Sequence, residues 1–248
     1  MQLSELSDYI GSLLEISRYR DYAPNGVQVE GRAEVTRIAT GVTASQRLLE
    51  AATAWGADAI LVHHGYFWRN EEQAVTGIKK RRLAHLLRHD ISLLAYHLPL
   101  DAHAELGNNA QLAQRLGLQV QGRFGEQDIA WHGELQQPQT LNQFASHVAS
   151  ALQRPPLVIG DHQRMLRRIA WCSGGAQSYF EQAVALGVDA FLTGEISEQN
   201  VHIADETGVA FIAAGHHATE RYGVQALGEH IARQFKIEHR FFDMDNPV

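Results

Sequence analysis

The sequence predicts an α/β protein whose two halves resemble each other. Apolar runs typical of buried strands alternate with amphipathic helical segments, and this order favours parallel strand pairing. The same order occurs twice, and the two copies align without a gap. Ligand-type side chains follow the strands in both copies. We therefore expect two similar α/β domains, at residues 1–125 and 126–248, that arose by internal duplication.

The first copy of the strand-helix-strand unit lies near the N-terminus. Residues 36–42 are predicted to form a strand, 45–55 an amphipathic helix and 57–63 a second strand. A third strand is expected at residues 91–96.

The second copy repeats this order about half the chain later. Residues 168–172 and 188–193 read as strands on either side of a helix at 177–186, and another strand is expected at 209–214. With an offset of 131 residues, 11 of the 28 positions from 37 to 64 are identical. Ala, Gly and Leu recur in any such unit, but the ungapped span favours duplication over chance similarity.

Three pairs of potential metal ligands follow apolar runs. His63 and His64 end the run 59–62, and the pairs His97/Asp101 and His216/Glu220 correspond to each other at an offset of 119. In contrast, His63-His64 aligns with Gly194-Glu195, so the two halves differ at that position. The carboxyl ends of parallel strands are where open α/β sheets place their ligands. The spacing therefore indicates a metal site.

The number of candidate ligands favours two ions over one. Successive residues of a strand point to opposite sides, so we expect His63 and His64 to serve different ions. His216 and Glu220 share a helix face if a helix begins after Gly215, which makes Glu220 a candidate bridge. Asp101 would complete one coordination sphere. Any single histidine is more often a hydrogen-bonded core residue, but several at strand ends favour ligation.

Three further positions leave alternatives open. His97 is either a ligand or a residue that orients Asp101. Glu195 is a candidate catalytic base or a carboxylate that orients metal-bound water, unless it caps the following helix. The glycine-containing turn at 173–175 can aim N–H groups at an anion, or it serves only to make a tight turn.

The composition excludes several functional classes. A formal net charge of -7 and a pI near 6.0 argue against nucleic-acid binding. The basic run at 79–82 is interpreted as a solvated helix start. No segment approaches the roughly 20 apolar residues of a membrane span, and no signal peptide is recognised. The single Cys172 excludes an internal disulfide. We expect a cytoplasmic protein.

At the residues above, the chain resembles the Nif-three-like dinuclear metal-centre family, also known as the GTP cyclohydrolase I type 2 family. It is most similar to the short bacterial members, without the insertion that some relatives carry between the halves. The resemblance extends over the whole chain and rests on the segments 21–31, 62–65, 97–101, 192–195 and 215–220.

The resemblance implies two similar α/β domains, each with a mixed sheet in three layers, and a homohexameric ring with inward-opening metal centres. It also implies two divalent ions per subunit, with Fe, Zn and Mn as candidates. The ligands that carry over by resemblance are His63, His64, Asp101, His216 and Glu220.

The hypothesis with most support is a dinuclear metal-dependent hydrolase acting on a small molecule, with GTP as the candidate substrate. In a cyclohydrolase, hydroxide attacks C8 of guanine, the imidazole ring opens and formate leaves. The triphosphate would be held by Lys79, Arg82, Arg221 or the 173–175 turn. Two alternatives remain: a non-catalytic metal-binding, metal-insertion or regulatory ring protein, and a generic metal-dependent phosphoesterase.

Overall fold

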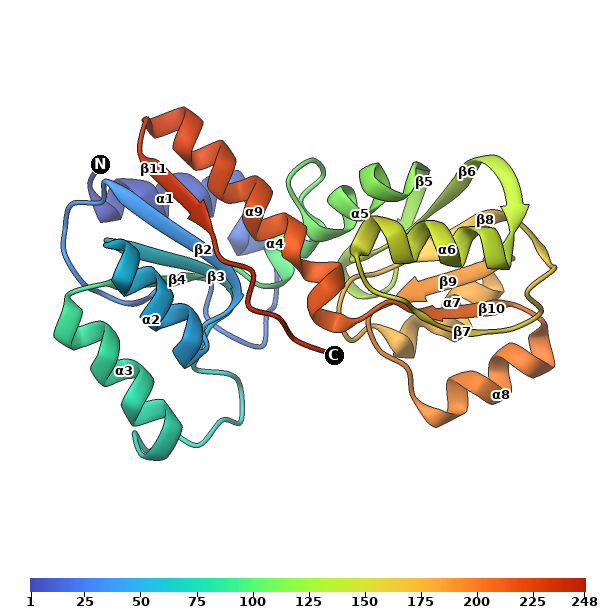
Figure 1. Ribbon diagram of the computed structural model, residues 1–248, viewed down its shortest axis with the longest axis horizontal. Helices are drawn as coiled ribbons and strands as arrows, with labels where there is room; N and C mark the ends of the chain where they lie inside the picture. Colours follow the sequence, from blue (N-terminus) through green and yellow to red (C-terminus); the bar gives the residue numbers. More distant parts are fainter. The chain divides into compact units, whose positions relative to one another are not determined.

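The computed structural model describes residues 1–248, which divide into two compact units (Figure 1). The first unit comprises Met1–Gly107 and Gly223–Asp245, and the second comprises Asn108–Tyr222 and Asn246–Val248. This division differs from the single boundary expected near residue 125, because the chain returns to the first unit near its end. The return is made by α9 (His216–Phe235), whose Val224, Leu227 and Ile231 are fully buried in the first unit's core.

The first unit is built on a mixed five-stranded sheet with the order β1-β4-β3-β2-β11. All neighbours pair in parallel except β1 and β4, which are antiparallel. The strands are β1 (Gly26–Val29), β2 (Arg37–Thr43), β3 (Ala59–His64), β4 (Ser92–Ala95) and β11 (Glu238–Phe241).

Helices cover both faces of this sheet, which makes three layers (Figure 1). One face packs against α1 (Leu3–Leu13) and the later turns of α9, and the other against α2 (Gln46–Trp55) and α3 (Gly77–His89). Successive residues of β3 show why both faces are apolar. Leu61 packs with the residues of α1 and α9, and Ile60 packs with those of α2 and α3. The short elements are η1 (Ile16–Arg18) and α4 (Leu98–Ala102).

The second unit contains a six-stranded mixed sheet with the order β5-β6-β8-β9-β10-β7. Strands β8, β9 and β10 pair in parallel, whereas β5, β6 and β7 pair antiparallel with their neighbours. The strands are β5 (Leu118–Phe124), β6 (Ala130–Thr140), β7 (Leu157–Ile159), β8 (Met165–Trp171), β9 (Ala190–Thr193) and β10 (Ala210–Ala213).

This sheet also lies between two helical layers (Figure 1). One side packs against α5 (Asn108–Leu116) and α6 (Leu141–Leu152). On the other side, Phe180 of α7 (Phe180–Ala185) packs against Phe191 and Phe211 of the sheet. The remaining elements are η2 (Glu126–Asp128), η3 (Gln177–Tyr179) and α8 (Glu198–Thr207). None of the chain's helices combines the length and apolar character needed to cross a bilayer.

The topology confirms the repeat that the sequence predicts. Each unit has three parallel strands in chain order, flanked by an antiparallel strand: β2-β3-β4 with β1, and β8-β9-β10 with β7. A carboxylate also repeats at the offset of 131: Asp58 accepts hydrogen bonds from the backbone N–H groups of Thr36 and Arg37, and Asp189 from those of Arg167 and Arg168. The expected helix at 177–186 is divided into η3 and α7.

Asp58→Asn is expected to lower the free energy of unfolding by about 1–3 kcal/mol, since the buried carboxylate accepts two backbone bonds and one from the Thr36 hydroxyl. Burial raises the pKa of Asp58, but these hydrogen bonds and the charge of Arg32 lower it further, so the net pKa is below its ordinary value. The charged form therefore stabilises the fold above about pH 4, and this contribution is lost as the pH falls through the lowered pKa.

Urea unfolding at pH 7 and pH 3 would measure both effects, and the difference between wild type and Asp58→Asn should shrink at the lower pH. Asp90→Asn is the matched control, because Asp90 is exposed and Asn tolerates its left-handed backbone. Equal stability of the two variants at pH 7 would contradict the role of Asp58.

Candidate metal centre

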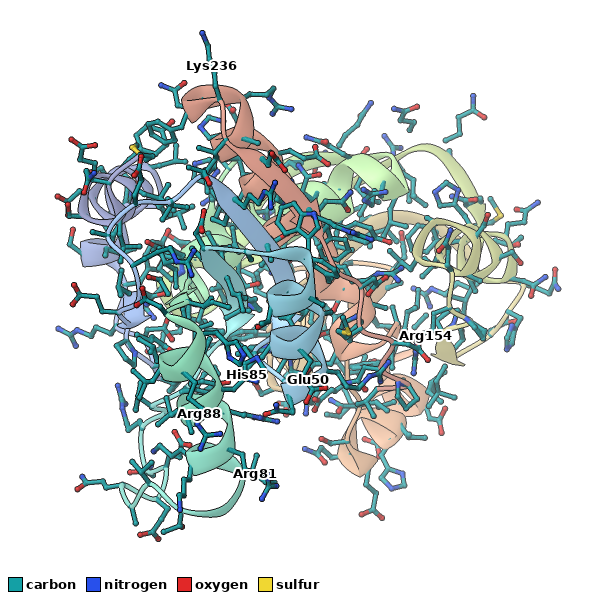
Figure 2. All side chains as sticks on the ribbon, turned by 60° about the vertical axis from the view of Figure 1, so that its left-hand side comes forward. Glu50, Arg81, His85, Arg88, Arg154 and Lys236 are labelled. Carbon is teal, nitrogen blue, oxygen red and sulfur yellow. The ribbon has the colours of Figure 1, made fainter.

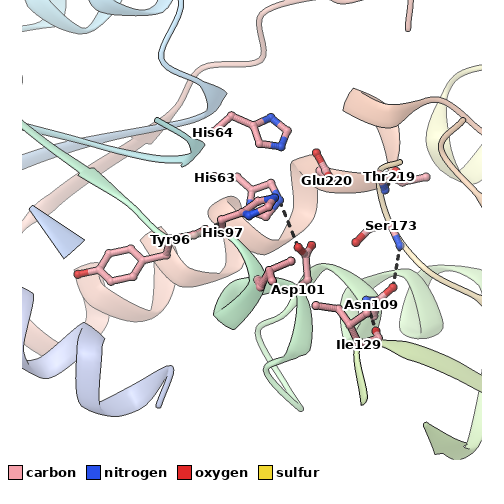
Figure 3. Close-up of polar contacts among 12 residues, drawn as sticks. His63, His64, Tyr96, His97, Asp101, Asn109, Ile129, Ser173, Thr219 and Glu220 are labelled. Carbon is pink, nitrogen blue, oxygen red and sulfur yellow. Dashed lines mark hydrogen bonds and ion pairs between the residues drawn. The ribbon is translucent and has the colours of Figure 1, made fainter. Parts of the chain in front are cut away.

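Three histidines of the first unit meet at the carboxyl ends of neighbouring parallel strands. His63 and His64 end β3, and His97 follows β4. The ring centroids are 4.6 Å apart for His63 and His64, and 5.0 Å apart for His63 and His97. One nitrogen from each ring lies within 4.8 Å of the others. Figure 3 shows these rings beside the Asp101 carboxylate of α4. We call His63, His64, His97 and Asp101 the histidine cluster.

His63 is held in an orientation suited to ligation. Its Nδ1 lies 3.0 Å from the backbone oxygen of Tyr96, and because a carbonyl only accepts, Nδ1 must carry the proton. This leaves the Nε2 lone pair facing Asp101, whose Oδ2 is 3.5 Å away. The ring is fully buried and Asp101 is nearly so. A hydrogen bond from the non-ligating nitrogen to a carbonyl is the usual support of a metal-binding imidazole.

His97 is oriented by residues far away in the sequence. Its Nδ1 lies 2.7 Å from Asp21 Oδ1, and its backbone N–H donates to Asn25 Oδ1. Asn25 Nδ2 in turn donates to Asp21. Burial raises the pKa of Asp21, but the hydrogen bond and charge of His97 outweigh it and hold the pKa at about 2. An ionised Asp21 keeps the proton on Nδ1 of His97, so that Nε2 is the nitrogen suited to a ligand.

His64 departs from the expectation that it would point away from His63. Alternation along the strand predicts opposite directions, yet the two rings at the end of β3 are neighbours. Thr43 Oγ1 lies 3.2 Å from His64 Nδ1, and the Trp68 ring packs 5.9 Å from the His64 ring. The geometry of this strand therefore does not by itself assign the two histidines to different ions.

The second unit contains a group of two carboxylates and one imidazole, which we call the carboxylate cluster: Glu195, His216 and Glu220. His216 begins α9, so Glu220 follows one turn later on the same helix face, as expected from the sequence. His216 Nδ1 lies 2.6 Å from Glu195 Oε1, and Nε2 lies 3.1 Å from Glu220 Oε2. Burial lowers the pKa of His216, but hydrogen bonds and charges of both carboxylates raise it to about 9.

Glu195 does not cap the helix that follows it. The N-cap of α8 is Ser197, whose N–H donates to Asn200 Oδ1. Glu195 instead accepts from His216 with one oxygen, and its other oxygen lies 3.3 Å from Gln177 Nε2. Its side chain is 37% exposed, compared with 4% for Glu220. The structure thus places Glu195 against His216, with part of its side chain open to solvent.

The glycine turn after β8 makes room for Glu220. Gly174 has a φ of +66°, and a Cβ added there would overlap Glu220 Oε1. Two of the turn's N–H groups are already used within the unit: Ser173 N donates to Asn109 Oδ1 (Figure 3), and Gly174 N donates to Thr219 Oγ1. These contacts favour the structural interpretation of the turn over an anion site.

The cations that the sequence proposed for a triphosphate have protein partners. Lys79 donates to the backbone oxygen of Glu72 and lies 3.6 Å from Glu71. Arg82 lies over the Tyr66 ring, and Arg221 donates to the backbone oxygen of Leu152. Nothing in these contacts selects one of them as a phosphate ligand.

Two residues with clear roles escaped the sequence interpretation. Asp21 lies in the segment 21–31, which carries the family resemblance. Its role is not evident from the sequence, because its contact with His97 spans 76 residues. Gly174 resembled an ordinary turn glycine, although two consecutive glycines in a strand-to-helix turn were the available signal.

The chain matches one family model over residues 1–247, described as Duf34/NIF3 (NGG1p interacting factor 3). The protein belongs to the DUF34/NIF3 family. This result and the topology above confirm the resemblance and the two-sheet α/β fold expected from it.

Relatives and solved structures match over nearly the whole chain. A protein of Pseudomonas aeruginosa named GTP cyclohydrolase 1 type 2 homolog is 57% identical over 249 residues, covering 99% of this chain and 98% of its own. A Yersinia pestis protein with the same name is 54% identical and covers 100% of both chains. The solved structure of protein ybgI, of unknown function, superposes with a TM-score of 0.97 at 49% identity, with 100% of both chains covered.

The donor atoms fit a divalent metal ion. Imidazole nitrogens and carboxylate oxygens suit Zn, Fe and Mn, and the three histidines bring their nitrogens close enough to share an ion. The Tyr96 carbonyl and Asp21 fix the tautomers that ligation needs. The divalent metal that the resemblance implies is thus consistent with the side chains of this chain.

Gly174→Ala is expected to displace the Glu220 carboxylate and to lower metal affinity at least tenfold. Gly187→Ala is the matched control: its φ of +71° imposes similar strain, but its Cβ would contact only Arg168 Nη1, at 3.3 Å. Metal titration of the two variants, with thermal unfolding alongside, separates strain from ligand displacement. If both variants bind metal as well as wild type, Glu220 is not a ligand.

Proposed function

We propose that this protein is a dinuclear metal-dependent hydrolase of a purine nucleotide, with GTP as the candidate substrate. The observation that carries the proposal is the histidine cluster, in which three imidazoles and a carboxylate meet at the ends of parallel strands. The relatives' printed name, GTP cyclohydrolase 1 type 2 homolog, supports the choice of GTP.

We propose two divalent ions per chain, with Fe, Zn and Mn as candidates. His97 is a further ligand or a neighbour that supports them. This assignment is supported by the fixed tautomer of His63, by the burial of Asp101 and by the space that Gly174 leaves beside Glu220. The five proposed ligands are His63, His64, Asp101, His216 and Glu220.

Divalent ions held by such ligands supply Lewis acidity and hydroxide at neutral pH, which is the chemistry that opening an imidazole ring requires. We assign the transfer of protons by a protein side chain to Glu195. Its Oε1 is engaged with His216 Nδ1, while the side chain remains partly exposed, so it can exchange a proton with solvent. A base positioned in this way contributes about 10²–10⁴-fold to the rate of a hydrolysis.

The metal-loaded protein is expected to release formate from GTP, and Glu195→Gln is expected to reduce this rate by about 10²–10⁴-fold without loss of metal. Gln keeps an oxygen that accepts from His216, so the imidazole should stay in place. Glu198→Gln is the matched control, since Glu198 is an exposed carboxylate in the first turn of α8. Formate release and metal content would be measured on the same samples.

Two results would contradict the enzymatic proposal. Turnover of GTP no greater than that of a Glu220→Ala variant would exclude the cyclohydrolase. If phosphoester, nucleotide and amide panels also fail while metal is retained, a metal-binding, metal-insertion or regulatory protein is the better description. Turnover of a phosphoester but not GTP would support a phosphoesterase instead.

A further inference from the structure

A second candidate site lies in the first unit, between α2 and α3. It is a pocket of about 490 Å³, a size typical of small-ligand sites. Seven of its lining residues come from α3 and one from α2, and none belongs to the histidine cluster. The lining residues are Gln46, Gly77, Lys80, Arg81, Ala84, His85, Arg88 and His89.

Basic side chains surround the pocket, because the basic face of α3 continues beyond the run at 79–82. Positions 81, 85 and 88 follow helical spacing, so Arg81, His85 and Arg88 share one face of the helix (Figure 2). No carboxylate is among the lining residues. The basic run at 79–82, which the sequence suggested was a solvated helix start, is therefore only part of this basic surface.

The three permanent cations of the pocket have no carboxylate partner. The ion pairs of this unit's other basic residues are Arg18–Glu15, Arg32–Asp58, Arg37–Glu238 and Lys79–Glu71. Lys80, Arg81 and Arg88 are absent from them and are exposed to solvent. Glu50, the one acidic residue of α2, accepts a hydrogen bond from Gln46 Nε2 and exerts its charge on His85, but it forms no ion pair with the three permanent cations. Three cations without a carboxylate partner favour an external anion.

The two imidazoles are held in place by contacts within the unit. Thr53 Oγ1 donates to the Leu49 carbonyl, so His85 Nε2, 2.8 Å away, is the donor in its contact with Thr53. His89 Nδ1 lies 2.8 Å from the His85 carbonyl and therefore donates to it. The rings pack with centroids 4.4 Å apart. The pocket wall is thus preorganised, and only the long cationic side chains need to be ordered on binding.

The spacing of the cations selects an elongated anion. Arg81 and Arg88 are seven residues apart on α3, which is about 10 Å along a helix axis. A single phosphate would meet one end of this row, whereas linked phosphates would meet cations at both ends. Arginine is suited to such contacts because its guanidinium binds phosphate oxygens in pairs. A long nucleic acid is disfavoured by the net charge of -7.

We propose that the pocket between α2 and α3 binds a small anion with two or three linked phosphates. Lys80 and Arg81 hold one end of the phosphate chain, and Arg88 holds the other. This site is separate in its residues from the histidine cluster, so the proposal stands whether or not the protein hydrolyses GTP.

The test uses inorganic tripolyphosphate, titrated into the metal-loaded protein by isothermal calorimetry. The double variant Arg81→Gln/Arg88→Gln is expected to bind at least tenfold more weakly than wild type, because both ends of the row lose their charge. The control, Arg233→Gln/Lys236→Gln, removes the same charge from exposed positions of the same unit, and it should bind as wild type does (Figure 2 labels Lys236).

A third variant, Glu220→Ala, shows whether the phosphates bind to a metal instead. We expect this variant to bind tripolyphosphate as tightly as wild type does. Thermal unfolding should be unchanged in the arginine variant, whose two side chains are exposed. Equal affinity in wild type and the arginine variant would overturn the proposal, as would loss of all binding in Glu220→Ala. Orthophosphate binding as tightly as tripolyphosphate, or arginine-dependent binding of a single-stranded oligonucleotide alone, would overturn the assignment of linked phosphates.

Discussion

The parallel pairing of β3 with β4 is the constraint on which the histidine cluster depends. It places the ends of two strands, 33 residues apart at His63 and Tyr96, in adjacent positions. The carbonyl of Tyr96 then fixes the tautomer of His63, and the next residue contributes the imidazole of His97. The same pairing of β9 with β10 places Glu195 beside His216 in the second unit. Without this register, neither group of ligand-type side chains would form.

The two units use one scaffold for different chemistry. At an offset of 131, Thr43 corresponds to Gly174 and His64 to Glu195. In the first unit Thr43 supports the His64 ring, whereas in the second unit the missing side chain leaves space for Glu220. One unit therefore concentrates imidazole nitrogens, and the other concentrates carboxylates around a single imidazole.

Local pattern was sufficient to predict the parallel core and the strand-end ligands. Apolar runs identify β2, β3, β8 and β9. They also predict that His63 lies at the end of a strand and that His216 lies just after one. Long-range pairing was not predictable in the same way: β11 joins the first sheet because Val224, Leu227 and Ile231 carry α9 into that core. The orientation of His97 by Asp21 and the clearance at Gly174 depend on tertiary contacts that no local pattern encodes. Alternation along β3 was misleading for His64, whose ring lies beside that of His63.

The central claim is that these imidazoles and carboxylates are metal ligands. Elemental analysis of protein purified without chelators or a metal-affinity tag tests it most directly, with His63→Ala, His216→Ala and, as a control, His162→Ala, whose side chain is exposed. We expect about two divalent ions per chain in wild type and in the control, and a clear loss in the other two variants. Full metal content in both His63→Ala and His216→Ala, or no metal in wild type after loading, would contradict the account.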